Sequence, residues 1–319
     1  MSDFIIKKFN TFEEIPDIFT TQSPFQTLWY QRIFAKHFCN LEDMILLGVY
    51  KDIKCIGYVN FERNNDSILL LGMKLIFDKE ELTDFGDIVL DNKYETYRKE
   101  MWDVIILWLK ENSYEYLQLD YVREESGTLS VFKNQIIFEQ ANSPFVDLKD
   151  QTWESYLKLL DQKARKELKR KMRRLETINN GFTYFQNISE ENFDEFIRLL
   201  KLSNPEKALF MTDKMKEFFW DLITSDKKDW KVILSFLQIE GKNVATIFSF
   251  ENNRSILGYN SGYDHGSNYY SVGLLIHAFK IKQALENCIE TYDFLRGEER
   301  YKFDLGAKKK SLFKISISL

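Results

Sequence analysis

Apolar and polar positions follow an order of elements that occurs twice along the chain. In the first half, short stretches rich in Ile, Val, Leu and Tyr are separated by polar turns, which is typical of a β-meander. The predicted strands of this half are 44–50, 55–61, 67–75 and 116–122. Before the last of them, apolar residues at helical spacing predict a helix over 92–111. Residues 12–37 also have a helical pattern, which breaks near Ser23-Pro24.

The second half repeats this order. Its predicted strands are 232–239, 243–250, 255–259 and 289–295, and its predicted helix is 271–287. The letters agree as well, because Phe-Glu-Arg-Asn-Asn-Asp-Ser-Ile-Leu at 61–69 matches Phe-Glu-Asn-Asn-Arg-Ser-Ile-Leu at 250–257 with one residue deleted. We therefore expect two copies of one α/β module, with residues 1–142 and 143–319 as two domains.

The segment that opens the second copy is predicted to be an amphipathic, strongly basic helix. Its apolar stripe has spacings of three and four residues and consists of Leu157, Leu160, Ala164, Leu168, Met172 and Leu175. Over 158–174, nine basic residues oppose two acidic ones, although the net charge of the whole chain is −5. This charged face is either solvated or a docking face for an anionic partner, such as coenzyme A, a nucleotide-linked sugar, tRNA or a polysaccharide.

The composition excludes several classes of protein. The 27 Phe, 16 Tyr and 6 Trp residues among 319 can form a large core and argue against disorder. No apolar run approaches the roughly 20 residues of a membrane helix, and the N-terminus lacks a basic segment followed by an apolar one. We therefore expect a soluble cytoplasmic protein without membrane insertion.

Cysteine, histidine and glycine usage narrows the chemistry. The cysteines are too few and too scattered for a disulfide framework or a zinc site: Cys39, Cys55 and Cys288. The chain has three histidines: His37, His265 and His277. The sequence motifs of hydrolases, metalloproteases, phosphate-loop nucleotidases and dinucleotide enzymes do not occur. The sequence therefore argues against these four classes of enzyme, and we expect no metal.

Several short motifs stand in a fixed order along the chain. They are Ser-Pro-Phe-Gln at 23–26, Ser-Pro-Phe-Val-Asp-Leu at 143–148, Gly-Tyr-Asp at 262–264, Tyr-Ser-Val-Gly-Leu-Leu at 270–275 and Tyr-Asp-Phe-Leu-Arg-Gly-Glu-Glu-Arg-Tyr-Lys at 292–302. Together they resemble the GNAT acyltransferase branch associated with cellulose and exopolysaccharide biosynthesis, which is similar to the Fem-type peptidyltransferases. The resemblance covers nearly the whole chain. It implies tandem GNAT-like modules with mixed α/β sheets, and acyl-CoA as the donor.

Acyl transfer from a thioester to an amine needs four kinds of group. A general base takes a proton from the amine, and N–H donors stabilise the oxyanion. An acid such as Tyr assists the departing thiolate, and backbone N–H groups at a helix start bind pyrophosphate. The reaction requires neither a metal nor a covalent cofactor, which suits this sequence.

Three residues near the end of the second copy are the candidate catalytic groups. Asp293 lies in an apolar predicted strand, where burial would raise its pKa toward that of a useful base; a structural hydrogen bond is the other interpretation. Glu298, in the polar loop that follows, is the alternative base, and Tyr301 is the candidate acid. The repeat places Gln118 of the first copy opposite Asp293. We therefore assign the active site to the second copy and regard the first as degenerate or substrate-binding.

The candidate cofactor site is the start of the predicted helix. Tyr270, Ser271 and Gly273 stand there; Ser271 is a suitable N-cap, and Gly273 would allow a phosphate to approach the backbone. Lys302 or Arg296, in the following loop, could bind phosphate or carboxylate. Ordinary helix capping and solvated loop charges are the alternatives for these residues.

Nearby aromatic and polar side chains are candidates for binding the acceptor. Tyr259 and Tyr263 would line a substrate groove or pack in the core, and Arg296 would bind an anionic group of the substrate. His265, in a Gly-Ser-Asn loop, is a weaker candidate base. His277 lies in the middle of the predicted helix, where we expect a structural role.

Three functions remain open from the sequence. The first is an N-acyltransferase that uses acyl-CoA, with an amine on a sugar or small metabolite as acceptor. The second keeps the fold and takes the acyl group from aminoacyl-tRNA, as Fem-type enzymes do; the basic helix motivates it. The third is a non-catalytic protein that binds anionic glycans or a biosynthetic partner.

Overall fold

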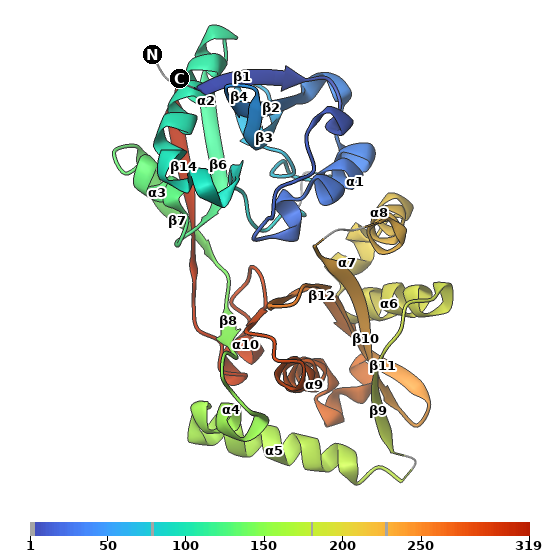
Figure 1. Ribbon diagram of the computed structural model, residues 1–319. Helices are drawn as coiled ribbons and strands as arrows, with labels where there is room; N and C mark the ends of the chain where they lie inside the picture. Colours follow the sequence, from blue (N-terminus) through green and yellow to red (C-terminus); the bar gives the residue numbers. More distant parts are fainter. Residues whose placement is uncertain (1–3, 78–79, 180, 227–228) are drawn as a thin grey trace. The chain divides into compact units, whose positions relative to one another are not determined.

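The computed structural model describes most of the chain: residues 4–77, 80–179, 181–226 and 229–319. The chain forms two compact units (Figure 1). The first unit consists of Met1–Ala141 together with Lys310–Leu319, and the second consists of Asn142–Lys309. Each unit is a mixed sheet covered by helices, as the repeat predicts.

The first unit is built on an eight-stranded sheet with the order β1-β2-β3-β4-β6-β14-β7, in which β5 also pairs with β3. Its strands are β1 (Phe4–Phe9), β2 (Met44–Lys51), β3 (Lys54–Asn64), β4 (Ser67–Leu70), β5 (Val89–Leu90), β6 (Tyr116–Arg123), β7 (Ile136–Asn142) and β14 (Ser311–Ser318). Its helices are α1 (Leu28–Phe38), α2 (Arg98–Glu111) and α3 (Gly127–Val131). The buried side of α2 includes Trp102, Ile105 and Leu109.

The second unit is built on a six-stranded sheet with the order β8-β13-β12-β11-β10-β9. Its strands are β8 (Phe145–Asp147), β9 (Phe182–Gln186), β10 (Lys231–Ile239), β11 (Lys242–Glu251), β12 (Ser255–Tyr263) and β13 (Thr291–Asp293). Its helices are α4 (Trp153–Leu159), α5 (Gln162–Glu176), α6 (Glu190–Ser203), α7 (Pro205–Phe210), α8 (Asp213–Thr224), α9 (Val272–Glu286) and α10 (Arg300–Asp304), and a 3-10 helix (His265–Tyr270) precedes α9.

Alternating residues of β11 explain why helices cover both faces of this sheet. Ile247 belongs to the core cluster that contains the buried residues of α9. Phe248, the next residue, points the other way and contacts Phe196 of α6 and Phe219 of α8, with ring centroids 5.6 and 5.1 Å apart. The sheet is therefore buried on both faces, which accounts for the nearly continuous apolar run in this strand.

One pair of parallel strands has the same pairing in both sheets, which confirms the repeat. In the first unit, residues 67–69 of β4 pair in parallel with 116–118 of β6. In the second unit, residues 255–257 of β12 pair in parallel with 291–293 of β13. The strands β4 and β12 both present Ser-Ile-Leu at these positions, so the short letter match reports an equivalence in three dimensions.

The same strand pairing identifies the residue of the first unit that corresponds to Asp293, the candidate base. Leu69 pairs with Gln118, and Leu257 pairs with Asp293. Gln118 therefore occupies in the first unit the position that Asp293 occupies in the second, as the alignment of the two helix ends predicts. Only the second unit carries a carboxylate there.

The expected boundary of the second copy needs one correction. The chain does not stay in the second unit to its end, because β14 pairs antiparallel with β6 and extends the first sheet. Conversely, β8, which follows β7 along the chain, pairs antiparallel with β13 of the second sheet. Leu312, Ile315 and Ile317 of β14 are buried. Their alternation predicts a strand, but it does not say which sheet the strand joins.

Several elements are shorter than predicted, for local reasons. Of the region 12–37, the α-helical part begins at Leu28, where the Thr27 side chain caps the helix by accepting from the N–H of Tyr30. The basic segment is two helices because Leu160 adopts extended backbone angles and Asp161 caps α5. The strand predicted to run to Leu75 ends at Leu70.

Candidate functional site

The second sheet opens where β12 and β13 part. Their hydrogen-bonded pairing ends at Leu257 and Asp293, but β12 continues to Tyr263. A bulge at Tyr259 lies just beyond this point, because Phe248 of β11 pairs with Asn260 while the next residue pairs with Gly258. A bulge bends its strand. The divergence therefore leaves a space at the ends of two adjacent parallel strands.

A cavity of about 410 Å³ occupies this opening. It is bounded by the end of β12, the first turns of α9, the segment from α6 to α7 and the start of α10. Its lining consists of Ser203, Asn204, Lys207, Ser261, Gly262, Tyr263, Asn268, Ser271, Gly273, Leu274, Ile276, His277, Glu299 and Tyr301. Four of the residues predicted as site residues line it: Tyr263, Ser271, Gly273 and Tyr301.

Tyr301 combines an apolar setting with access to the cavity. Its ring lies edge-on to Phe294, with centroids 5.9 Å apart, and 5.0 Å from the His277 ring. Burial raises the pKa of Tyr301, and the charge of Glu299 raises it further. The phenol therefore stays protonated at neutral pH and can donate a hydrogen bond or a proton.

The start of α9 presents backbone N–H groups to the same cavity. Ser271 has φ +57°, a left-handed conformation, and its carbonyl accepts the N–H groups of Leu274 and Leu275. Within the described ranges no carbonyl accepts the N–H groups of Val272 and Gly273. Of these two residues, Val272 is buried and Gly273 lines the cavity, so the N–H group of Gly273 is the one suited to bind an anion.

Gly273 is needed at this point because of its close neighbour. A Cβ atom built on Gly273 would lie 2.9 Å from the Tyr263 ring, closer than real contacts allow. Ser271 makes no side-chain cap bond, so the expected capping role of its hydroxyl is not observed.

Lys207 and Glu299 supply the charges of the lining. The Nζ atom of Lys207 lies 3.1 Å from Oδ1 of Asn260 and 2.9 Å from the carbonyl oxygen of Ser261. Glu299 is the one carboxylate among the lining residues that the structure describes, and its Oε2 atom lies 2.9 Å from Nζ of Lys302. Neither is among the predicted site residues: Glu299 stands in the motif at 292–302 without an assigned role, and Lys207 comes from a region without a recognised motif.

Asp293 is buried but does not belong to the lining. Its Oδ1 atom accepts from the Ser143 hydroxyl at 2.7 Å and from the N–H of Leu295 at 2.8 Å. Leu295 has φ +58°, so the carboxylate holds a turn in an unfavourable conformation. These contacts match the structural interpretation of this residue.

The other charged residues of the C-terminal motif brace their own loop. Glu298 is outside the lining and accepts from Asn142 at 2.6 Å and from Lys309 at 2.8 Å; the bond from Lys309 lowers the pKa of Glu298. Lys302 is buried, and its Nζ donates to the carbonyl of Arg296 at 2.8 Å and to that of Gly297 at 3.1 Å. The Lys302 ammonium thus fixes the loop instead of facing the cavity, and Arg296 is not a lining residue either.

Two of the predicted tyrosines lie elsewhere. Tyr259 packs in an aromatic cluster on the α6 side of the sheet, with its ring 4.9 Å from that of Phe250. Tyr270 packs against the core cluster and lies edge-on to Tyr269 at 5.1 Å. Neither lines the cavity. At a bulge or helix start, a one-residue shift changes the direction of a side chain, which sequence alone does not reveal.

Helix α5 retains its basic character in the structure. Leu168 and Leu175 are buried, so its apolar stripe faces the core as expected. Glu167 forms ion pairs with Arg170 and Lys171. Five further cations of α5 have no acidic partner among the residues that the structure describes: Lys163, Arg165, Lys166, Lys169 and Arg173.

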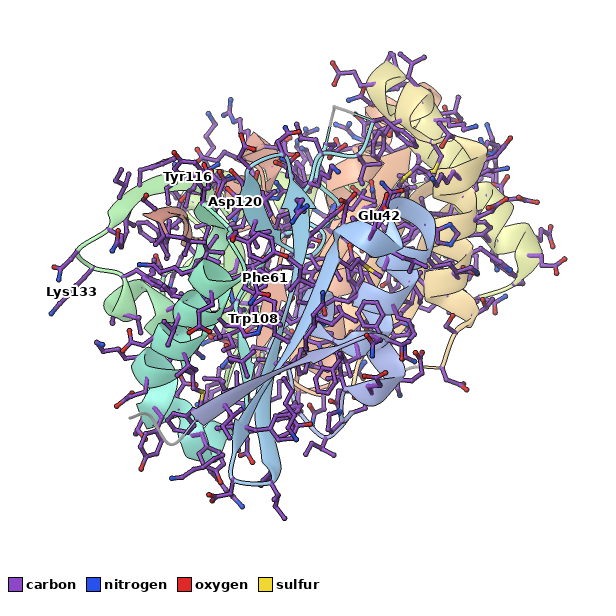
Figure 2. All side chains as sticks on the ribbon, turned by 90° about the horizontal axis from the view of Figure 1, so that it is seen from above. Glu42, Phe61, Trp108, Tyr116, Asp120 and Lys133 are labelled. Atoms are coloured by element: carbon purple, nitrogen blue, oxygen red, sulfur yellow. The ribbon has the colours of Figure 1, made fainter. Side chains whose placement is uncertain are left out.

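The corresponding opening in the first unit is filled. Gly86 is wedged between the continuations of β4 and β6: a Cβ atom there would lie 2.6 Å from Leu70 and 3.2 Å from the carbonyl oxygen of Asp120. A cavity of about 10 Å³ remains beside it, and another of about 90 Å³ lies nearby. Asp120 lies on β6 (Figure 2). Its side chain is buried and accepts from Gln140 at 2.9 Å.

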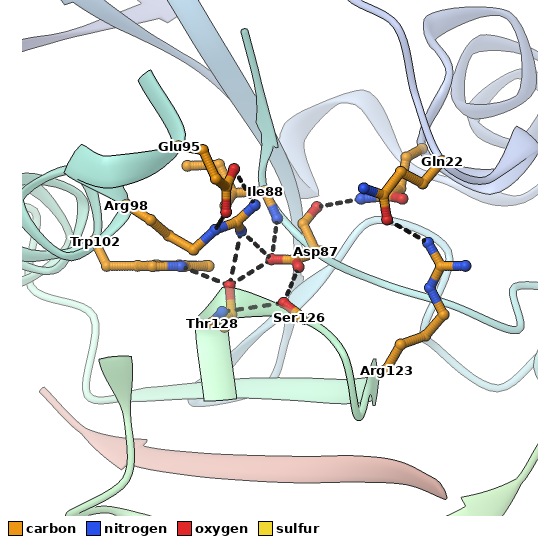
Figure 3. Close-up of polar contacts among 10 residues, drawn as sticks. Gln22, Asp87, Ile88, Glu95, Arg98, Trp102, Arg123, Ser126 and Thr128 are labelled. Carbon is orange, nitrogen blue, oxygen red and sulfur yellow. Dashed lines mark hydrogen bonds and ion pairs between the residues drawn. The ribbon is translucent and has the colours of Figure 1, made fainter. Parts of the chain in front are cut away.

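A network of hydrogen bonds holds the segment that contains Gly86 and Asp87 in place (Figure 3). Asp87 accepts from Thr128 at 2.6 Å, from Arg98 at 3.0 Å and from the Ser126 hydroxyl. The Trp102 indole also donates to the Thr128 hydroxyl, at 3.0 Å. The network joins the segment before α2 to the start of α3, so in this unit the polar side chains serve the packing.

No group of three or more His, Cys, Asp or Glu residues is arranged to hold a metal ion in the described ranges. Among the described helices, none combines the length and apolar character needed to cross a membrane.

Comparison with known proteins agrees with this geometry. Residues 162–303 match the family described as acetyltransferase (GNAT) domain, a range that contains α5, the cavity and Tyr301. No curated protein matches the sequence.

Solved structures resemble the whole chain. FemX is 11% identical and superposes with a TM-score of 0.67 over 95% of this chain and 94% of its own. A conserved protein of unknown function from Bacteroides thetaiotaomicron is 12% identical, with a TM-score of 0.61 over 99% of this chain and 100% of its own. L-PGS from Bacillus licheniformis is 12% identical, with a TM-score of 0.57 over 94% and 93%. At these identities the likeness concerns the fold, which is a mixed α/β, tandem GNAT-like fold.

Proposed function

We propose that the second unit is an N-acyltransferase that moves an acetyl or other acyl group from acyl-CoA directly to an amine. The observation that carries this proposal is the cavity at the divergence of β12 and β13. It combines a half-buried protonated tyrosine, a carboxylate and the unbonded N–H group of Gly273 at a helix start. These are the groups that direct acyl transfer from a thioester requires.

The acyl donor would bind with its pyrophosphate at the start of α9. The N–H group of Gly273, which lines the cavity, and the positive end of the helix dipole favour an anion there. The thioester would extend from this point into the cavity, toward Tyr301. Lys302, assigned to cofactor binding from the sequence, acts in this proposal only by holding the loop that carries Glu299 and Tyr301.

The reaction balances with the groups at hand. The amine nitrogen attacks the thioester carbon, a C–N bond forms and the carbonyl oxygen becomes an oxyanion. Glu299 takes the amine proton. The intermediate collapses, the C–S bond breaks, and the thiolate takes the phenolic proton of Tyr301. The proton on Glu299 then reaches the phenolate through water, which restores both residues, and the products are an amide and a thiol.

Asp293 is a positioning residue in this proposal. It fixes the backbone of Leu295 and thereby the start of the loop that leads to Glu299. Glu298, the alternative base, is paired with Lys309 outside the cavity. We infer that the base is Glu299, one residue further along the same motif.

The acceptor class follows from the remaining lining. Tyr263 offers an aromatic face, and Asn204 and Asn268 offer amide groups, a combination that suits an amino sugar or another small polar amine. An amine on a sugar or a polysaccharide precursor also fits the exopolysaccharide-associated branch suggested by the motifs at 262–302.

A second donor deserves a direct test because of α5. Its five unneutralised cations form a surface that would attract a polyanion, which favours aminoacyl-tRNA as the alternative donor. Reversing three of these charges (Lys163→Glu, Lys166→Glu and Lys169→Glu) separates the two cases. If the donor is acyl-CoA, its Kd stays within about twofold and tRNA binding is weak or absent. A large loss of tRNA binding together with tRNA-dependent transfer would support the alternative.

The proposal is tested by calorimetry and by turnover. Acetyl-CoA is titrated into the full chain, and thiol release is followed with a panel of amino sugars, amino acids and polyamines. Binding at one site per chain and amine-dependent thiol release are expected. The matched variant Gly273→Ala should weaken binding, because its methyl group would displace Tyr263. If acetyl-CoA neither binds nor reacts, and anionic glycans bind instead, the chain is the non-catalytic binding protein.

A further inference from the structure

His277 has an unusual position for a residue in the middle of a helix. It is 3% exposed, yet it lines the cavity. Its ring lies 5.0 Å from that of Tyr301 and 5.5 Å from that of Phe294. The imidazole is therefore held beside the candidate acid by rings on two sides.

One ring nitrogen of His277 is bonded to a buried phenol. Nδ1 lies 2.8 Å from the hydroxyl oxygen of Tyr292, whose side chain is fully buried. Burial raises the pKa of Tyr292 well above its usual value, so the phenol keeps its proton. In the part of the chain that the structure describes, no other acceptor lies within reach of this hydroxyl. The phenol therefore donates to Nδ1, and the ring proton must reside on Nε2.

The second nitrogen of the ring, Nε2, forms no hydrogen bond with the described residues. It is also not one of the fully enclosed polar atoms. An atom that is neither bonded nor enclosed is accessible, and the cavity is the space that His277 borders. The result is an N–H donor directed at the position where a ligand would bind.

The imidazole is also held neutral. Burial lowers the pKa of His277 to about 3, and the charges of Lys302 and Lys207 contribute in the same direction. These two lysines, with Tyr292 and Tyr301, are the titratable groups that face the ring from the neighbouring elements. A neutral imidazole with a fixed tautomer cannot accept the amine proton at Nε2, but it can donate a hydrogen bond over the whole physiological pH range.

We propose that Tyr292 and His277 form a fixed donor pair whose Nε2–H binds the carbonyl oxygen of the acyl group and stabilises the oxyanion. In this arrangement His277 is a catalytic residue and Tyr292 is a positioning residue that sets the tautomer. A neutral donor fits a site between two lysines, because it adds no charge there and requires no reorganisation when the oxyanion develops. This inference rests on the proposed acyl transfer and adds the group that receives the developing charge.

The test is nitrogen NMR of the full chain labelled with ¹⁵N-histidine. The chain has three histidines, so the His277→Gln variant assigns the signals of His277 by their loss. In the unliganded protein, His277 should show a protonated Nε2 and an unprotonated Nδ1, unchanged between pH 5 and 8. A protonated Nδ1 would overturn the inference at once.

Ligands then test the acyl contact. Acetyl-CoA should shift the Nε2 signal of His277, and CoA, which lacks the acyl group, should leave it close to its unliganded position. If both ligands shift the signal equally, or neither does, the proposed contact between His277 and the acyl group is wrong. Binding detected by calorimetry would in that case still support the donor site. If calorimetry detects no acetyl-CoA binding, the proposed function fails, and with it the acyl ligand of His277.

Variants provide an independent readout. His277→Phe keeps the ring and removes the donor, so kcat should fall about a hundredfold with KM within about threefold. His277→Gln can offer an N–H in the same direction and should recover part of that loss. Tyr292→Phe should allow both tautomers in the NMR spectrum and lower kcat by less than His277→Phe. A loss confined to KM, or an unchanged tautomer in Tyr292→Phe, would contradict the proposal.

Discussion

The two units place the same parallel strand pair in the same register and use it in opposite ways. In the first unit, Gly86 and its neighbours fill the opening and leave cavities of about 10 and 90 Å³ beside them. In the second unit, the equivalent opening is a cavity of about 410 Å³. The difference lies in the connection to the next helix, which spans residues 71–97 in the first unit and only 264–271 in the second. A long connection can fold back into the opening, and a short one leaves it accessible.

The polar residues of the two units differ in the same sense. In the first unit, Asp87, Arg98 and Thr128 bond to one another and hold the filling segment. In the second, Tyr301 and His277 border space and retain groups that a ligand can reach. Polar side chains beside the opening thus bond to one another in the first unit and border a cavity in the second.

The largest expected effect concerns the acid of the open unit. Tyr301→Phe removes the proton donor to the thiolate, so kcat should fall by about 10²–10⁴-fold in a thiol-release assay. Tyr121→Phe in the first unit, which removes the 3.1 Å bond to Glu81, should leave kcat unchanged. Similar losses in both variants would remove the functional distinction between the units.

The next effect concerns the filled unit. Asp87→Ala removes the acceptor of Arg98, Ser126 and Thr128, so the free energy of unfolding in urea should fall by about 2–3 kcal/mol. The value of kcat per folded molecule should not change. The exposed pair of Lys99 and Asp103 supplies the control, because Asp103→Ala should cost at most about 0.5 kcal/mol. A large loss of kcat in Asp87→Ala would place a reactive group in the first unit.

A third prediction uses pH to examine the buried histidine of the open unit. The pKa of His277 is about 3 in the folded protein, and its ordinary value of 6.5 applies to the unfolded chain. As the pH falls, the unfolded chain therefore binds the proton first. Unfolding is therefore favoured as the pH falls below 6.5. At about 1.4 kcal/mol per pH unit, His277 should lower the unfolding free energy by about 2 kcal/mol between pH 6.5 and 5.

The His277→Gln variant should lack this part of the pH dependence when urea unfolding is compared at the two pH values. Parallel curves for the variant and the unaltered chain would show that His277 titrates normally. Its ring would then not be buried beside Tyr292 and Tyr301 as the structure places it.

The smallest expected effect separates the two interpretations of Asp293. Asn at this position keeps an oxygen that can accept from Leu295 and Ser143, so Asp293→Asn should lower kcat by less than about tenfold. Loss of a general base would lower it by about 10²–10⁴-fold. A loss of that size, with Glu299→Gln nearly unaffected, would return the base to Asp293.

The sequence predicts the repeat because it depends on local pattern. Ser-Ile-Leu at 67–69 and 255–257 marks equivalent strands, and the pairing of Gln118 and Asp293 with the leucines of these strands follows from counting along the chain. Tyr263, Ser271, Gly273 and Tyr301 could be found because they stand in or beside the recognised motifs.

Other features depend on contacts between distant segments. The strand β14 alternates like any other strand, and only its pairing with β6 assigns it to the first unit. Lys302 and Glu299 form an ion pair, but only Glu299 lines the cavity, while Lys302 also donates to loop carbonyls. His277 is predicted to be a core histidine because its neighbours in the sequence are apolar. The same neighbours would surround a histidine that lines a cavity, so the sequence does not distinguish the two cases.

The central claim is that only the opening of the second unit binds the acyl donor. Hydrogen exchange of the full chain, followed by mass spectrometry with and without acetyl-CoA, tests it directly. We predict slower exchange at 261–263, 271–277 and 299–301, and no change at 83–88 or 120–128. Protection of the first unit at these segments, or no protection in either unit, would contradict the account.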